Sequence, residues 1–102
     1  MDVKYKISCG ILTIYFSGEL DEHTSSNARI ILDRLFLDNS NVKRVIYDLS
    51  GITFMDSTGI GLLIGRYKKL KQFNIPSYIS GASVNTEKII EIAGLYDIMP
   101  KY

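Results

Sequence analysis

The 102-residue sequence predicts an α/β fold: one domain, residues 1–102, in which a mixed β-sheet is flanked by helices in the order ββαβαβα. Three observations predict it. Two alternating apolar–polar runs lie close together near the N-terminus, a more continuous apolar run follows at residues 42–50, and segments with helical spacing separate the later strands. A chain of this length can hold one hydrophobic core.

The first two runs indicate a β-hairpin. In VKYKIS (3–8) and ILTIYFS (11–17), apolar residues alternate with polar ones, which is the period of a half-buried strand. Cys9 and Gly10 separate the runs, and a short break that contains glycine is typical of a hairpin turn. We therefore expect two neighbouring antiparallel strands.

A helix is expected after the turn GELD (18–21), with its end near residues 38–39. Apolar residues recur there at helical spacing, namely Ala28, Ile31, Leu32, Leu35 and Phe36. The run VKRVIYDLS (42–50) follows this helix. Its nearly continuous apolar character predicts a central strand that is covered on both faces.

The clearest helix pattern covers residues 57–73. Its apolar stripe consists of Ile60, Leu63, Ile64, Tyr67 and Leu70. Asn74 suits a left-handed position at the helix end, and Pro76 prevents continuation. We expect its basic residues to form a solvated face; they are Arg66, Lys68, Lys69 and Lys71.

The C-terminal quarter predicts one more strand and one more helix. SYIS (77–80) reads as a short strand, and residues 84–93 read as a helix capped by Ser83 or Asn85 and closed by Gly94. Residues 95–99 are expected to add a last edge strand before Pro100.

Composition limits the classes of function. Twelve basic against eleven acidic residues give a net charge of +1, which argues against direct binding of nucleic acid through a basic surface. The single cysteine, Cys9, cannot form an internal disulfide, and a reducing cytoplasm is the natural location. Neither a signal peptide nor a membrane-spanning run is present, so no contact with a membrane is expected.

The junction GITFMDSTGIG (51–61) carries the candidate chemistry. The glycines at 59, 61 and 65 invite comparison with a dinucleotide-binding turn, but the third is one residue too far and no acid lies about twenty residues on. One cysteine and one histidine make no metal site. We expect neither a cofactor nor a metal. For Gly65 we expect a packing role, whereas for Gly59 and Gly61 packing and a backbone kept bare for a partner remain open.

Three interpretations of Ser57 are compatible with the sequence. A catalytic serine would need His23, the only histidine, and no nucleophile elbow surrounds Ser57, so an enzyme is the weaker class. A plain helix N-cap is the simplest alternative, although Ile60 stands where a capping box would place Glu or Gln. The small and apolar residues around Ser57 favour the third reading, a turn that docks into another protein.

With these segments the sequence resembles a known family, the anti-sigma factor antagonists, and most closely their sporulation type. Members of this family are small single-domain STAS proteins. The resemblance rests on GELDEHT (18–24) and on YDLSGITFMDSTGIGLLIGRYKKLK (47–71), in which FMDSTGIG is the specific part. It implies a STAS-like fold and an unphosphorylated protein that binds an anti-sigma factor, itself a serine kinase, and so frees a sigma factor. It also implies that the kinase phosphorylates Ser57 and that a phosphoserine phosphatase reverses the step.

The expected switch is electrostatic. A phosphate would add a charge of about −1.5 to −2 at a helix N-terminus, where it is locally favourable, so we expect an effect on the interface and no unfolding. The residues expected to meet the partner lie around the phosphate, provided that the two loops converge; they are Glu19, Asp21, Asp56, Thr58, Gly59, Ile60 and Gly61.

Two points of the resemblance stay open. Members of the family usually have one more C-terminal helix, and we do not expect it within residues 95–102. Thr58 stands where a second serine is frequent, and it could accept a minor share of the phosphate. The alternative function is a STAS scaffold module in another phospho-regulated assembly.

Overall fold

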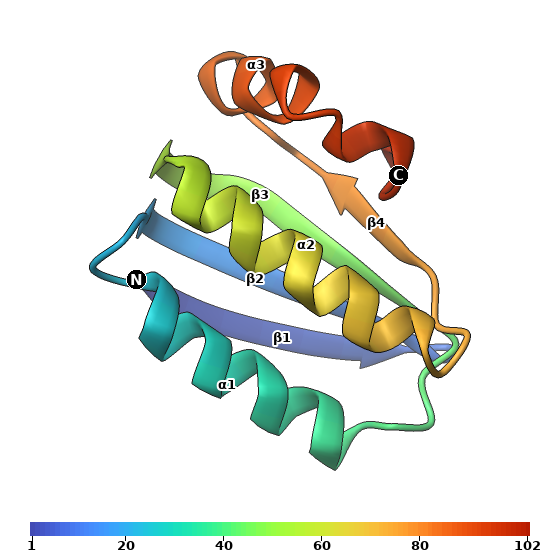
Figure 1. The fold of residues 1–102 in the computed structure, drawn as a ribbon. Helices are drawn as coiled ribbons and strands as arrows, with labels where there is room; N and C mark the ends of the chain where they lie inside the picture. Colours follow the sequence, from blue (N-terminus) through green and yellow to red (C-terminus); the bar gives the residue numbers. More distant parts are fainter.

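A four-stranded mixed sheet organises the chain, and the computed structural model describes all residues from 1 to 102 (Figure 1). Its strands lie in the spatial order β1-β2-β3-β4, which is also their order in the sequence. The predicted order ββαβαβα is confirmed, with the bounds β1 Asp2–Ser8, β2 Ile11–Leu20, α1 Ser25–Asp38, β3 Arg44–Met55, α2 Ser57–Lys71, β4 Ser77–Ser80, α3 Val84–Ile92 and a short 3₁₀ helix, η1, Leu95–Asp97.

The predicted hairpin is confirmed. β1 pairs with β2 in antiparallel register from Asp2↔Ser17 to Ser8↔Ile11. Cys9 and Gly10 connect them with φ angles of 53° and 78°, the two positive values that a tight two-residue hairpin turn requires. The apolar face of β1, which includes Tyr5 and Ile7, is less buried than expected, because β1 is an edge strand. Tyr5 and Ile7 are 53% and 44% exposed.

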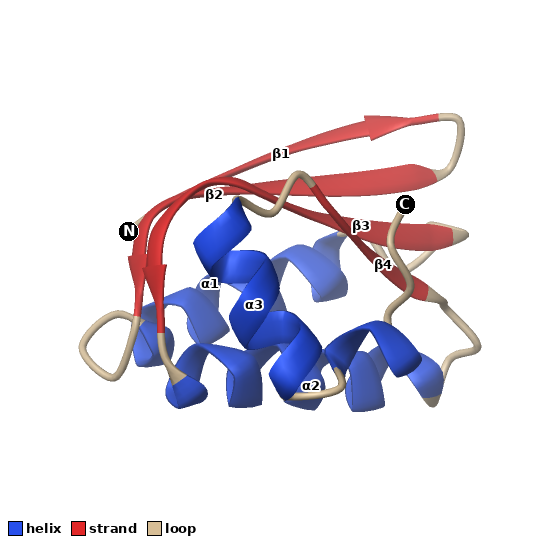
Figure 2. Ribbon diagram, turned by 90° about the horizontal axis from the view of Figure 1, so that it is seen from above, coloured by secondary structure: helices blue, strands red, loops and turns tan.

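All three helices lie on the same face of the sheet (Figure 2). The connections β2-α1-β3 and β3-α2-β4 join parallel neighbours and advance in one direction across the sheet, so right-handed crossovers place both helices on one side. The expectation that residues 42–50 are covered on both faces is therefore wrong. On the helix-free face of β3, Arg44 and Asp48 are partly exposed and Ser50 is exposed.

The core lies between this sheet face and the helices. The alternating residues Leu12, Ile14 and Phe16 of β2 are at most 1% exposed, and Val45, Tyr47 and Leu49 of β3 are fully buried beside them. From the helices, the residues predicted by spacing cover the sheet: Ala28, Leu32, Leu35 and Phe36 of α1, and Ile60, Leu63 and Leu70 of α2. No helix of the chain has the length and apolar character needed to cross a membrane.

The C-terminal end differs from the predicted edge strand. Residues 95–97 form η1 because Gly94 adopts φ 71° and turns the chain, and Leu95 and Met99, four residues apart, are both fully buried. The chain pairs with β4 only after η1, at residues 100–102. The Ile79 amide donates to the Pro100 carbonyl at 3.0 Å, and the Tyr102 amide donates to the Ile79 carbonyl at 2.8 Å. The chain end thus lies against β4.

Candidate functional site

The first turn of α2 is capped by Asp56, the residue before Ser57. Its carboxylate Oδ1 accepts hydrogen bonds from the amides of Thr58 (2.9 Å) and Gly59 (3.1 Å). Asp56 has extended backbone angles, as an N-cap residue should. The alternative in which Ser57 caps the helix is therefore wrong. Ser57 is the first helical residue, it is exposed, and its hydroxyl makes no hydrogen bond within the chain.

The two loops predicted to converge do so. At the carboxyl ends of the parallel strands, Glu19 pairs with Phe54 and Leu20 with Met55, and the Asp56 amide lies 3.4 Å from the Leu20 carbonyl oxygen. The turn that leads into α1 and the start of α2 consequently share one edge of the sheet. In Figure 1 the two helices run side by side in the same direction from this edge.

Asp21 has a structural task at this edge. Its Oδ1 accepts hydrogen bonds from the amides of His23 (2.9 Å) and Thr24 (3.1 Å). Burial alone would raise the pKa of the Asp21 carboxyl, but the hydrogen bonds from His23 and Thr24 and the nearby His23 ring together hold it below its usual value. Asp21 is thus a charged cap for the turn before α1, whatever it contributes to a partner.

The glycines of the motif separate into two kinds. A Cβ on Gly59 would stand 2.7 Å from the Leu20 carbonyl oxygen and 3.0 Å from side-chain carbons of Leu20 and Met55, so Gly59 is needed for packing α2 onto the sheet. A Cβ on Gly61 or on Gly65 would meet no atom within 4 Å. The packing role expected for Gly65 is therefore wrong.

The other site candidates differ in how much surface they offer. Thr58 is exposed, whereas Ile60 is only 7% exposed and belongs mainly to the core. The apolar surface beside Ser57 comes instead from Phe54, which is 51% exposed. Sequence alone does not separate the exposed Phe54 from the buried Met55, because their exposure depends on how β3 ends.

The alternative in which Ser57 is a catalytic serine activated by His23 lacks the required geometry. No hydrogen bond joins His23 to Ser57. The His23 side chain is largely exposed and its Nε2 lies 3.7 Å from the Glu22 carboxylate. His23 therefore lies beside Glu22 and forms no hydrogen bond with the Ser57 hydroxyl.

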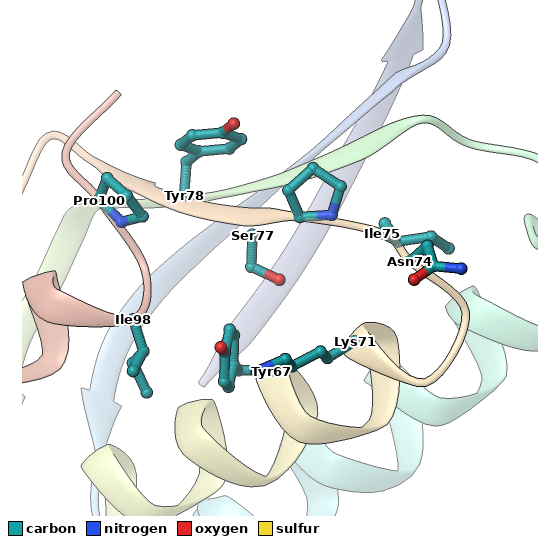
Figure 3. A pocket seen from close by; sticks show the side chains of 9 residues that line it. Tyr67, Lys71, Asn74, Ile75, Ser77, Tyr78, Ile98 and Pro100 are labelled. Atoms are coloured by element: carbon teal, nitrogen blue, oxygen red, sulfur yellow. The ribbon is translucent and has the colours of Figure 1, made fainter.

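A hollow also lies at the opposite end of α2, distant from Ser57 along the helix (Figure 3). Tyr67 and Lys71 of α2 form one wall, with the Lys71 ammonium 5.7 Å from the Tyr67 ring centre, and the Ser77 side chain points from β4 toward α2. Ile98 and Pro100 close the side nearest the chain end.

Comparison with known proteins places the chain. The model of the STAS domain matches residues 2–102. The chain belongs to the STAS domain family. It is 32% identical over 93 residues to an anti-sigma F factor antagonist of Paenibacillus polymyxa, covering 91% of this chain and 79% of the relative. It is also 32% identical over 88 residues to an anti-sigma-B factor antagonist of Listeria monocytogenes, covering 86% and 75%.

The fold of this STAS domain is shared by solved structures. The Bacillus cell fate determinant SpoIIAA in its phosphorylated form aligns with a TM-score of 0.73 and 24% identity, covering 99% of this chain and 91% of that one. The predicted resemblance to the family and the predicted fold class are thereby confirmed.

Because Asp56 caps α2 and the Ser57 hydroxyl makes no hydrogen bond, we expect substitutions at the two positions to differ in their effect on stability. Replacing Asp56 with Ala should lower the free energy of unfolding by about 1 kcal/mol, because two amides lose their acceptor. Ser57→Ala should change it by less than about 0.5 kcal/mol, as for other exposed surface substitutions. Urea denaturation of both variants checks this, with Asp56→Asn as the control that keeps an acceptor. A larger loss for Ser57→Ala would mean that its hydroxyl has a structural partner.

Proposed function

We propose that this STAS domain is an anti-sigma factor antagonist controlled by phosphorylation of Ser57. In this proposal, the unphosphorylated chain binds an anti-sigma factor that is also a serine kinase, and the bound kinase releases its sigma factor. The names of the two curated relatives support the antagonist class. A chain of the same fold exists in a phosphorylated form, which supports a phosphoacceptor on this fold.

The observation that carries the proposal is the free Ser57 hydroxyl. Asp56 satisfies the amides of Thr58 and Gly59, so the Ser57 side chain has no structural hydrogen bond to lose when it reacts. Its position at the start of α2 exposes it to an incoming kinase, and the positive end of the helix dipole favours the anionic product.

The proposed reaction is transfer of the γ-phosphoryl group of ATP to Ser57 Oγ. A bond forms between Oγ and the γ-phosphorus, the bond from that phosphorus to the oxygen bridging to the β-phosphate breaks, and the hydroxyl proton leaves to a base of the kinase. ADP and phosphoserine are the products. We further propose that a phosphoserine phosphatase restores the hydroxyl by hydrolysis.

The test is intact-mass spectrometry after incubation with the anti-sigma factor of the same organism and ATP. We expect the mass of one phosphoryl group on the wild-type chain and on Thr58→Ala, and none on Ser57→Ala. Thr58→Ala is the matched control, because it removes the neighbouring exposed hydroxyl and leaves Ser57. Phosphate on Ser57→Ala would contradict Ser57 as the acceptor. A stable complex without any phosphate would favour the scaffold alternative.

A further inference from the structure

Gly61 and Gly65 are glycines that the fold of this domain does not require. They lie four residues apart on the same face of α2. A glycine inside a helix costs about 1 kcal/mol relative to alanine, and a methyl group at either position would meet nothing within 4 Å. Alanine would therefore be both tolerated and more stable. The bare backbone at these positions is better explained by something that approaches α2 from outside.

Both glycines line a groove between the N-terminal halves of α1 and α2. The groove has a volume of about 490 Å³ and begins beside Ser57, since Thr58 forms part of its wall. Leu62 is the only hydrophobic residue of the lining, and no carboxylate takes part in it. The lining residues are Ser25, Ser26 and Arg29 of α1 and Thr58, Gly61, Leu62, Gly65 and Arg66 of α2.

The groove holds one unpaired positive charge, that of Arg29, because the other arginine of the lining, Arg66, is paired with Asp33. Arg29 is exposed and forms no ion pair within the chain. The Arg66 side chain is only 14% exposed. Its Nη1 lies 3.2 Å from the Asp33 carboxylate, yet its Nε and Nη1 atoms are buried without a hydrogen bond. The expected solvated position of Arg66 is therefore wrong.

Two helix dipoles strengthen this charge. The N-termini of α1 and α2 lie at the same edge of the sheet, and each carries about half a positive charge (Figure 1). Asp56 offsets part of this charge at the start of α2, because its carboxylate accepts from the amides of Thr58, a lining residue, and Gly59. The Asp21 carboxylate is bound to the amides of His23 and Thr24, which lie outside the lining. The chemical complement of the groove is a carboxylate.

We propose that the groove receives an acidic segment of the anti-sigma factor. The backbone of that segment lies against Gly61 and Gly65, and one of its carboxylates pairs with Arg29. This proposal rests on the proposed function and specifies its interface. Binding at this groove also explains how phosphorylation weakens the complex. A phosphate dianion on Ser57, beside the mouth of the groove, repels the incoming carboxylate and offsets the charge of Arg29.

The experiment measures affinity and thermal stability on the same proteins. Binding of the unphosphorylated chain to the anti-sigma factor of its own organism is followed by titration calorimetry. We expect the double variant Gly61→Ala, Gly65→Ala to melt no lower than the wild type and to bind at least tenfold more weakly. Arg29→Gln should also lose at least tenfold. Arg34→Gln is the matched control, because Arg34 lies on α1, is largely exposed and pairs with Asp38, and it should bind as the wild type does.

The outcomes separate this proposal from the proposed function. If the wild type binds and the glycine and Arg29 variants bind equally well, the proposal that the groove binds the anti-sigma factor is overturned, while the antagonist function stands. If the wild type does not bind, the proposed function is overturned and the groove falls with it. Should the glycine variant melt lower than the wild type, its premise is wrong. Arg29→Gln alone then decides, with wild-type affinity overturning the groove and a tenfold loss that Arg34→Gln does not share supporting it.

Discussion

Phosphorylation of Ser57 is expected to weaken binding of the anti-sigma factor by about a hundredfold and to leave the fold intact. A hundredfold loss corresponds to about 2.8 kcal/mol. The phosphate introduces a charge of about −1.5 to −2 beside the Asp56 carboxylate, which is held in place by two amides of α2. Because Asp56 cannot turn away without losing those bonds, the two anions remain close.

The expected magnitude follows from where this charge lies. Like charges about 4 Å apart repel by about 1 kcal/mol in water and by about 4 kcal/mol at an effective dielectric constant near 20. In the free chain, water and the helix N-terminus accommodate the phosphate, so the domain stays folded. Under a partner the same group loses its water. Binding therefore decreases much more than stability does.

Calorimetric titration of the phosphorylated and unphosphorylated chains with the anti-sigma factor measures this effect. Ser57→Asp, with a single charge, should reproduce part of the loss, and Ser57→Asn, of similar size without charge, should reproduce little of it. Equal losses for Asp and Asn would show that bulk at residue 57 is responsible. A phosphorylated chain that binds as tightly as the unmodified one would contradict the switch.

Features that depend on neighbouring residues in the sequence could be predicted well. The Cys9-Gly10 turn, the left-handed Asn74 and the Ser83 cap each follow from local backbone chemistry, and the structure has all three. α2 itself ends at Lys71, two residues before the predicted end at residue 73. The candidate edge could also be predicted, because FMDSTGIG is contiguous. Local chemistry also allows Ser57 to cap α2, but the adjacent Asp56, a stronger acceptor, is the cap in the structure.

Features that depend on packing could not be predicted. Gly59 and Gly65 look alike in sequence, and only the position of Leu20 shows that one is enclosed and the other open. Arg66 follows the same pattern as the solvated lysines, yet α1 covers it and supplies Asp33. The groove requires two helices that are separate in sequence. No spacing within either helix could indicate it.

Gly59→Ala is expected to destabilise the domain by roughly 1 to 2 kcal/mol, although alanine favours helices. Its methyl group would stand 2.7 Å from the Leu20 carbonyl oxygen, and a backbone atom cannot rotate away. Overpacking of this kind costs about 1–3 kcal/mol, which exceeds the gain of up to about 1 kcal/mol from helix propensity.

The consequence reaches the functional edge, because Gly59 is where α2 contacts the end of β2. To relieve the contact, the first turn of α2 must move away from Leu20, and Ser57 moves with it. Thermal unfolding of Gly59→Ala should show a midpoint lower by about 4–8 °C per kcal/mol lost. Gly61→Ala, two residues away with open space around it, should keep or raise the midpoint. If both variants shifted the midpoint equally, the enclosed position of Gly59 would not be what holds α2 in place, and the geometry that presents Ser57 would need another cause.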